Sequence, residues 1–183
     1  MASAPSIVLY LACSLDGFIA APDGSVGWLE AFSSDGEDYG YAGFLARVGA
    51  IVMGSRAYEQ AFESGAWSYA NLPCFVLTSR TLPMPDGADI RFRSGDDLEA
   101  VAAEARAAAG DRAVWLFGGG VLARSMLDAG IVDTLDLALM PVLIGDGIPL
   151  FVAGLRRYGL ALRESRTHAN GVVQLRYSMR PER

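Results

Sequence analysis

Short runs of apolar residues, separated by Gly- and Pro-containing turns, recur along most of the chain. Runs of this length that end at turn signals are typical of buried strands. Several stretches between them carry apolar residues at helical spacing, which predicts helices. From these patterns we expect strands over residues 7–13, 50–53, 74–78, 90–92, 113–117 and 134–140, and helices over residues 39–48, 56–63, 96–109 and 121–129.

The clearest of these helices covers residues 96–109. Asp96 is a suitable N-cap, and Glu99 three residues later completes a capping-box arrangement. Gly110 follows the last apolar position, so we expect the helix to end there.

Two segments predict no regular structure, and the end of the chain follows another pattern. Residues 25–38 predict a long loop, and residues 141–151 a Gly- and Pro-rich connection. Residues 160–167 and 172–178 flank Asn170-Gly171, which predicts a hairpin. The chain therefore predicts an α/β fold whose mixed, mostly parallel sheet ends in an antiparallel hairpin. Its length of 183 residues fits one domain, so we expect a single domain over residues 1–183.

The composition excludes several kinds of chemistry. All 15 basic residues are Arg, so a Walker A phosphate loop and a Schiff-base mechanism, which both need Lys, are excluded. With a net charge of -6, the chain matches neither nucleic acid nor an anionic membrane surface, and we expect neither partner. The sequence shows no signal-peptide pattern and no apolar stretch long enough to span a membrane, which predicts a cytoplasmic protein.

Histidine and cysteine are too scarce for most metal sites. His168 is the single His, and Cys13 and Cys74 are the two Cys. A zinc site of the usual kind needs three or four such ligands, so we expect no metal. Both Cys lie in apolar runs and are expected to be reduced and buried. His168 stands beside the hairpin turn, where we expect it to be solvated and without a role.

Three strand ends carry residues suited to an anionic ligand. Gly118-Gly119-Gly120 follows an apolar strand and opens a helix, so its amides can face an anion. Met53-Gly54-Ser55-Arg56 has the same position after another strand, and Thr78-Ser79-Arg80 offers hydroxyls and a guanidinium. Each segment alone is also compatible with an ordinary strand end or turn, and Thr78-Ser79-Arg80 by itself favours an exposed strand end. In a parallel sheet, however, all three would meet at one edge, which fits a dinucleotide.

Five segments together are similar to one enzyme superfamily. They are SLDGFIA at residues 14–20, MGSRAYE at residues 53–59, VLTSR at residues 76–80, FGGG at residues 117–120 and PVLIGDGIPLF at residues 141–151. In this order they resemble the dihydrofolate-reductase-like superfamily, and most closely the reductase domain of the riboflavin-biosynthesis enzymes and its stand-alone bacterial relatives. The resemblance implies a three-layer fold with a mostly parallel sheet of about eight strands, with NADPH extended across the strand ends.

The resemblance also implies individual cofactor contacts. The phosphates would meet Gly54, Ser55 and Arg56, and the adenosine ribose and 2′-phosphate would meet Thr78, Ser79 and Arg80. The pyrophosphate and nicotinamide side would meet Phe117, Gly118, Gly119, Gly120, Val121 and Leu122, with Ala12 and Ile19 bordering the nicotinamide. The family usually has Arg directly after the first Gly, where this chain has Ser55 followed by Arg56. NADPH is therefore the expected coenzyme, and NADH is not excluded.

At the substrate end, the resemblance implies two catalytic carboxylates. Asp38, with Glu37 and Asp35 close by, matches a carboxylate that binds the substrate ring and donates a proton. Alternatively, this acidic segment stabilises the N-terminus of the helix that begins near Tyr39. Asp16 belongs to a motif that closes over the substrate end. Four aromatic residues form a pocket or simply belong to the core: Trp28, Tyr41, Phe44 and Trp67.

The resemblance implies hydride transfer from a reduced nicotinamide to a small heterocycle or carbonyl compound. Riboflavin precursors and pterins are examples, as in 5-amino-6-(5-phosphoribosylamino)uracil reductase. The alternative is a module of the same fold that binds a nucleotide or small molecule without turnover. Relatives of this kind often form homodimers, for which residues 135–140 and the loop to Phe151 would offer an apolar face.

Overall fold

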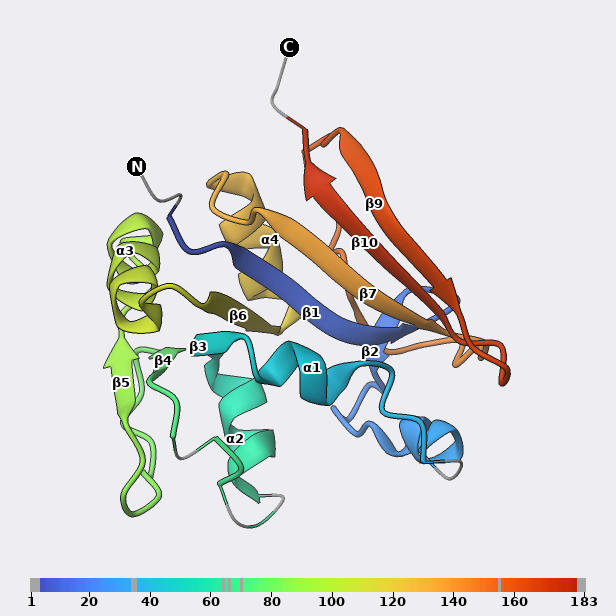
Figure 1. Ribbon diagram of the computed structural model, residues 1–183. Helices are drawn as coiled ribbons and strands as arrows, with labels where there is room; N and C mark the ends of the chain where they lie inside the picture. Colours follow the sequence, from blue (N-terminus) through green and yellow to red (C-terminus); the bar gives the residue numbers. More distant parts are fainter. Residues whose placement is uncertain are drawn as a thin grey trace.

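In the computed structural model, eight strands form one mixed sheet between two layers of helices (Figure 1). The structure describes residues 4–33, 36–63, 65, 67–69, 71–154 and 156–180. The strands are β1 (Ile7–Ser14), β2 (Phe18–Ala20), β3 (Val48–Gly54), β4 (Cys74–Leu77), β5 (Ile90–Arg93), β6 (Ala113–Gly118), β7 (Thr134–Met140), β8 (Ile148–Pro149), β9 (Leu160–Thr167) and β10 (Val173–Met179). The helices are α1 (Tyr41–Leu45), α2 (Ser55–Glu63), α3 (Leu98–Ala109), α4 (Gly120–Asp128) and the 3-10 helix η1 (Gly27–Phe32).

The sheet order is β5-β4-β3-β6-β1-β7-β10-β9, and β2 pairs separately with β8. All neighbours from β5 to β7 are parallel, whereas β10 is antiparallel to both β7 and β9. The predicted fold class is therefore confirmed: a mostly parallel sheet of eight strands ends in an antiparallel C-terminal hairpin.

Each face of the sheet has its own hydrophobic core. Helices α3 and α4 pack on one face, where Val101, Ala105 and Met126 are buried against β1 and β6. Helices α1 and α2 pack on the other, where Phe44 and Tyr58 are buried against β3 and β4. The face of α1 also carries a dense group of aromatic rings around Trp115. Cys13 and Cys74 are free and buried, as predicted.

Most predicted elements are confirmed, but some boundaries are wrong. The helix expected over residues 39–48 is shorter, because Val48 and Ala50 already pair with β6 as part of β3. The N-cap of α3 is Asp97 rather than Asp96: the Asp97 side chain accepts a hydrogen bond from Ala100 N at 2.9 Å.

Two predicted loops contain short regular elements: η1 lies within residues 25–38, and β8 lies within residues 141–151. The predicted dimer face over residues 135–140 is also wrong. Strand β7 lies inside the sheet between β1 and β10, and Leu135 and Leu137 are buried in the core.

Candidate functional site

The carboxyl ends of β3, β4 and β6 lie side by side at one edge of the sheet. Gly54 pairs with Leu77, directly before Thr78, and Met53 pairs with Gly118. The three segments singled out for anion binding therefore follow neighbouring strands at the same edge, as expected for a parallel sheet. Their binding roles stay predictions.

The structure requires glycine after β6 for two different reasons. Gly118 and Gly119 have φ angles of 130° and 96°, a region that residues with a side chain rarely adopt. Gly120 instead allows close packing, because a Cβ there would collide with the carbonyl oxygen of Pro149. At Gly119 an added Cβ would meet open space. The first amides of α4 lack partners within the helix, so an anionic group can approach them from that side.

The remaining predicted cofactor residues differ in exposure. Val121 is 71% exposed beside the glycine segment, whereas Leu122 is buried in the core. Phe117 packs against Trp115 and Tyr69 rather than standing free. Among the others, the half-buried residues include Ala12, Ile19, Gly54, Ser55 and Thr78, and the exposed ones are Arg56, Ser79 and Arg80.

Arg80 is held by an acidic neighbour at the predicted adenosine end. Its Nη1 and Nη2 donate to Oε1 and Oε2 of Glu59 in α2, at 2.9 and 2.7 Å. The guanidinium keeps the pKa of Glu59 below its ordinary value, so the carboxylate is charged at neutral pH. A 2′-phosphate that binds Arg80 would therefore compete with Glu59.

Asp16 joins the β1–β2 turn to the loop after β7. Its carboxylate accepts hydrogen bonds from Ser14 Oγ at 2.5 Å and from the amides of Ile144 and Gly145 at 3.3 and 2.8 Å. These donors, the Ser14 hydroxyl above all, lower the pKa of Asp16. The side chain therefore braces this corner of the sheet edge, and its predicted catalytic role stays a prediction.

Asp38 stands at the N-terminus of α1. Its two oxygens accept from Gly40 N at 2.8 Å and Ala42 N at 3.0 Å. These amides lower the pKa of Asp38, so its carboxylate is ionised at neutral pH. The contacts match the helix-stabilising alternative, and proton donation by Asp38 stays a prediction. Asp35 lies outside the described residues.

His168 is not solvated, contrary to the sequence-based expectation. Its side chain is only 3% exposed, with Nε2 2.8 Å from Gln174 Oε1 and Nδ1 3.5 Å from Glu37 Oε2. The ring also packs edge-on against Tyr39, whose φ of 51° is the only positive value for a non-glycine among the residues described. The segment before α1 is thereby tied to the C-terminal hairpin.

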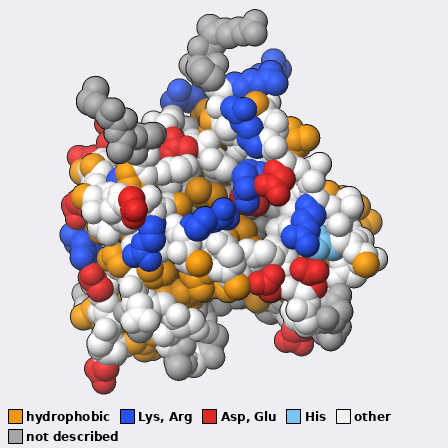
Figure 2. Space-filling model, in the orientation of Figure 1, with side chains coloured by type: hydrophobic (Ala, Val, Ile, Leu, Met, Phe, Trp, Pro, Cys, Tyr) orange, Lys and Arg blue, Asp and Glu red, His pale blue; other side chains and the backbone are white. Residues whose placement is uncertain are grey.

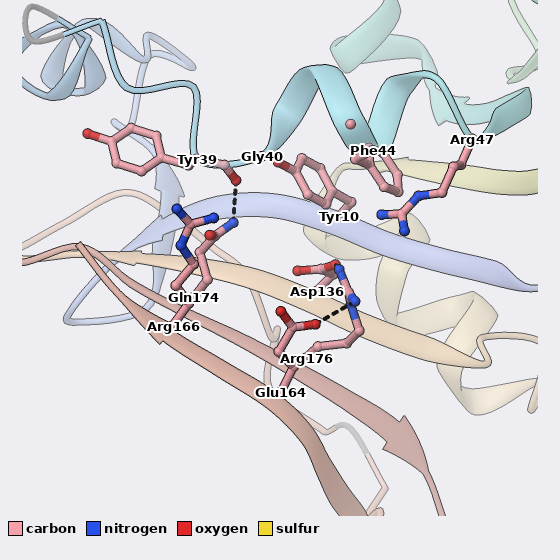
Figure 3. A pocket seen from close by; sticks show the side chains of 11 residues that line it. Tyr10, Tyr39, Gly40, Phe44, Arg47, Asp136, Glu164, Arg166, Gln174 and Arg176 are labelled. Atoms are coloured by element: carbon pink, nitrogen blue, oxygen red, sulfur yellow. Dashed lines mark hydrogen bonds and ion pairs between the residues drawn. The ribbon is translucent and has the colours of Figure 1, made fainter.

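A cavity of about 350 Å³ opens on the α1 face of the sheet (Figure 3). Its floor comes from β1, β7, β10 and β9, and its roof from α1 and the residues on either side of it. None of the predicted catalytic or cofactor-binding residues lines it. The lining residues are Tyr10, Tyr39, Gly40, Gly43, Phe44, Arg47, Asp136, Glu164, Arg166, Gln174 and Arg176.

Two neighbouring rows of paired residues contribute side chains to the cavity floor, all four residues of the first row and Gln174 and Arg166 of the second. One row crosses four strands through the pairs Tyr10–Asp136, Asp136–Arg176 and Arg176–Glu164. The next row, two residues further along each strand, is Ala12, Ala138, Gln174 and Arg166. Residues two apart on a strand share a face. Ala12, which the resemblance assigns to the nicotinamide, is therefore the neighbour of Tyr10 on the way to the sheet edge.

Charges in the floor are partly neutralised. Arg176 donates to the buried Asp136 at 2.8 Å and to Glu164 at 2.7 Å. Tyr10 stacks on Phe44, with ring centroids 3.9 Å apart and planes inclined by 7°. Burial, together with the Asp136 charge, raises the pKa of Tyr10 to about 12, so the phenol keeps its proton at neutral pH.

Of the four aromatic residues noted in the sequence, only Phe44 lines this cavity. Tyr41 and Trp67 pack in the aromatic core of the same face. The indole nitrogens of Trp28 and Trp67 are buried without a hydrogen-bond partner in the part of the chain described.

Two features are absent from the residues that the structure describes. None of their helices is long and apolar enough to cross a membrane. They also contain no group of three or more His, Cys, Asp or Glu side chains that could hold a metal ion.

Comparison with known proteins relates residues 5–174 to one family, because they match the family model for the RibD C-terminal domain. YwjB of Bacillus subtilis (strain 168), an uncharacterized protein, is 31% identical over 171 residues, covering 93% of this chain and 95% of YwjB. A crystal structure from Shewanella sp. PV-4, whose name links it to riboflavin biosynthesis, has a TM-score of 0.83 at 25% identity. It covers 96% of this chain and 99% of its own.

A more distantly related enzyme has a similar fold. Dihydrofolate reductase from Enterococcus faecalis, solved in complex with NADP(H), has a TM-score of 0.60 at 13% identity, covering 95% of this chain and 96% of the reductase. At this identity the similarity shows the fold alone. The chain thus has a dihydrofolate-reductase-like fold, which is a reductase-type fold.

Proposed function

Because the chain belongs to the RibD C-terminal domain family, we propose that residues 1–183 form one NADPH-dependent reductase domain. It transfers a hydride to a small heterocyclic or carbonyl substrate. The uncharacterized relative YwjB leaves the substrate open. Riboflavin precursors, as for 5-amino-6-(5-phosphoribosylamino)uracil reductase, and pterins are the compounds to test first, with NADH as the second coenzyme.

One observation carries this proposal: three ligand-suited segments share one sheet edge. The strand registers bring Gly54, Thr78 and Gly118 to neighbouring positions. An extended dinucleotide needs several such anchoring points along its length, and successive strand ends supply them. The open backbone at Gly119 gives the pyrophosphate a route to the amides at the start of α4.

The chain's own residues would bind and orient rather than react covalently. When bound, the coenzyme supplies the hydride. Ser55 and Arg56 at the start of α2 would hold phosphate oxygens, and Arg80 would hold the 2′-phosphate. Ala12 is small and half-buried, which leaves room for the nicotinamide ring between the sheet edge and Tyr10.

The substrate would occupy the cavity on the α1 face. The cavity has the size of a small-molecule site and begins one floor position from Ala12. A substrate there would lie between α1 and the sheet, close to the coenzyme. We keep Asp38 as the proposed catalytic carboxylate that binds the substrate ring; a bound substrate would have to raise its pKa before it could donate a proton. Asp16 is kept as the residue that closes the substrate end.

The test is a titration of the purified protein with NADPH and, separately, with NADH, followed by nicotinamide fluorescence. We expect saturable binding of NADPH. Coenzyme oxidation is then measured across pterins, flavin precursors and quinones. Absence of NADPH binding would overturn the proposal. Binding without oxidation of the coenzyme by any of these substrates would favour the alternative, a module that holds a nucleotide without turnover.

We also propose that the protein is a homodimer, as is common in such relatives. Light scattering tests this directly. A monomeric mass would contradict it.

A further inference from the structure

We propose that Gln174 is a specificity-determining residue of the α1-face cavity. Its amide N–H donates to a ring carbonyl or an unprotonated ring nitrogen of an uncharged ligand, and His168, which lies outside the cavity, positions this amide. The inference rests on the proposed function in taking the cavity as the substrate site. It names the group of this chain that distinguishes a ring with such an acceptor from a ring without one.

The hydrogen bonds of Gln174 fix the orientation of its amide. The amide nitrogen donates to the backbone carbonyl oxygen of Tyr39, which can only accept. A rotated amide would place its own oxygen against that carbonyl. The Gln174 oxygen therefore faces His168, whose Nε2 lies 2.8 Å away and must carry a proton. Both the neutral ring protonated on Nε2 and the imidazolium meet this requirement.

The two partners of this amide are themselves fixed by other contacts. His168 is almost fully buried, and its ring packs edge-on against Tyr39. The Tyr39 hydroxyl donates to the carbonyl oxygen of Phe32 and accepts from Asn170 Nδ2. Tyr39 also has a φ of 51°, a conformation that persists in a non-glycine residue only when its surroundings maintain it. The Gln174 amide is therefore oriented before a ligand binds.

One N–H of Gln174 remains for a ligand. A side-chain amide has two N–H groups. Among the residues that the structure describes, the Gln174 side chain bonds to Tyr39 and His168 and to no other. The amide stands in the cavity beneath the Tyr39 carbonyl (Figure 3). An acceptor atom of a ligand can therefore bind it without breaking an existing contact.

The neighbours of Gln174 leave space on the side of the proposed coenzyme. In its row of the sheet, Gln174 follows Ala12 on β1 and Ala138 on β7. Both have only a methyl group, so Gln174 is the first side chain along this row, counted from the position assigned to the nicotinamide, that can form a hydrogen bond. The stacked rings of Tyr10 and Phe44 supply an apolar surface in the same cavity. These surroundings suit a flat ring that carries an acceptor at its edge.

The protonation of His168 can be measured without a ligand. The chain contains a single His, so the nitrogen-15 NMR signals of the imidazole belong to His168 alone. We expect a proton on Nε2 at neutral pH in the wild-type protein. A neutral ring with its proton on Nδ1 would leave the Gln174 oxygen without a donor, and it would overturn the positioning role of His168.

The binding experiment compares two flat bicyclic probes. Lumazine has carbonyl and ring-nitrogen acceptors and is titrated at slightly acidic pH, where it is uncharged; naphthalene has the same size and no acceptor. Each titration is run without coenzyme and with saturating NADP⁺. Gln174→Met removes the amide and keeps a side chain of similar length. The control Gln60→Met removes an amide that bonds to Gly24 and lies outside the cavity. Circular dichroism verifies that each variant is folded.

We expect the wild type to bind lumazine more tightly than naphthalene. Gln174→Met should weaken lumazine binding about three- to tenfold, the scale of one neutral hydrogen bond, and leave naphthalene binding unchanged. Gln60→Met should bind both probes like the wild type. The proposal is overturned if lumazine does not bind, if naphthalene binds equally well, or if Gln174→Met matches Gln60→Met.

Two variants of His168 separate positioning from packing. His168→Phe keeps a ring beside Tyr39 but cannot donate to Gln174, whereas His168→Gln loses the ring but places an amide donor near the position of Nε2. We expect His168→Phe to weaken lumazine binding about two- to threefold and His168→Gln to retain it. The opposite order would show that His168 acts by packing alone.

NADPH titration of the same samples separates this inference from the proposed function. Lumazine binding that depends on Gln174, without NADPH binding, would reject the reductase and keep the acceptor site. NADPH binding together with lumazine binding that does not depend on Gln174 would reject the acceptor site and keep the reductase.

Discussion

Arg80 and Glu59 form a two-point ion pair, 2.9 and 2.7 Å long, at the predicted adenosine end of the coenzyme site. Both side chains are partly exposed, at 52% and 35%. The pair is therefore screened by solvent and adds little to stability, but it determines what Arg80 is free to bind.

Glu59→Gln should increase the affinity for NADPH while leaving the affinity for NADH nearly unchanged. The substitution frees Arg80 and removes a negative charge next to the 2′-phosphate. We expect a change of about two- to fivefold, the scale of an exposed ion pair. Fluorescence titration of both coenzymes measures it. The matched control is Asp89→Asn, which breaks the similar exposed pair with Arg91 on β5. Equal changes for the two coenzymes would contradict a 2′-phosphate contact.

A second prediction follows from the corrected N-terminus of α3. Asp97→Ala should lower the free energy of unfolding by about 1 kcal/mol, because Ala100 N loses its acceptor. Asp96→Ala should change it by less than about 0.5 kcal/mol, as for an ordinary surface position. Urea denaturation of the two variants makes the comparison. A larger loss for Asp96→Ala would show that the cap lies one residue earlier in solution.

This difference shows which features the sequence could predict. Apolar runs and Gly–Pro punctuation are local, and they predicted the strands at residues 134–140 and 160–167 with the observed bounds. A choice between Asp96 and Asp97 depends on backbone angles that the pattern does not contain. Likewise, the central place of β7 in the sheet depends on pairings between distant segments, so an apolar strand was mistaken for a free face.

In the candidate site, too, one part could be predicted from the sequence and another could not. The glycine and hydroxyl segments were predictable because each follows its own strand, and parallel strands end at one edge. The cavity was not, because its floor joins β1, β7, β9 and β10 in register. Arg47 and Arg166 are separated by more than half of the chain, and neither lies in a recognisable motif. The one available signal was the alternation of polar residues along the C-terminal hairpin, Gln174 and Arg176 included.

His168→Ala should destabilise the protein by about 1–3 kcal/mol, although the residue follows directly on an exposed strand. The substitution leaves Gln174 Oε1 without its 2.8 Å partner and removes a nearly buried ring from beside Tyr39. Thr167→Ala is the control, because Thr167 is exposed. Urea denaturation gives the stability, and amide exchange should increase over residues 37–40. Equal stability of the two variants would mean that the His168 contacts contribute nothing.

Asp16 should stabilise the β1–β2 corner only while it is ionised. Its folded pKa lies below the ordinary 3.8, so its contribution is fully present above that pH and is lost as the pH falls through the folded pKa.

Asp16→Asn cannot accept all three hydrogen bonds, and it should increase amide exchange at Ile144 and Gly145 at neutral pH. Asp23→Asn, the same substitution at a carboxylate that accepts only a local hydrogen bond from Ser25, should leave both amides protected. In the wild type, acidification through the folded pKa of Asp16 should reproduce the effect of Asp16→Asn, whereas the variant itself should show little further change. Protected amides in Asp16→Asn at neutral pH would mean that the loop after β7 is held by other contacts, such as the hydrogen bond from Leu15 N to Val142 O.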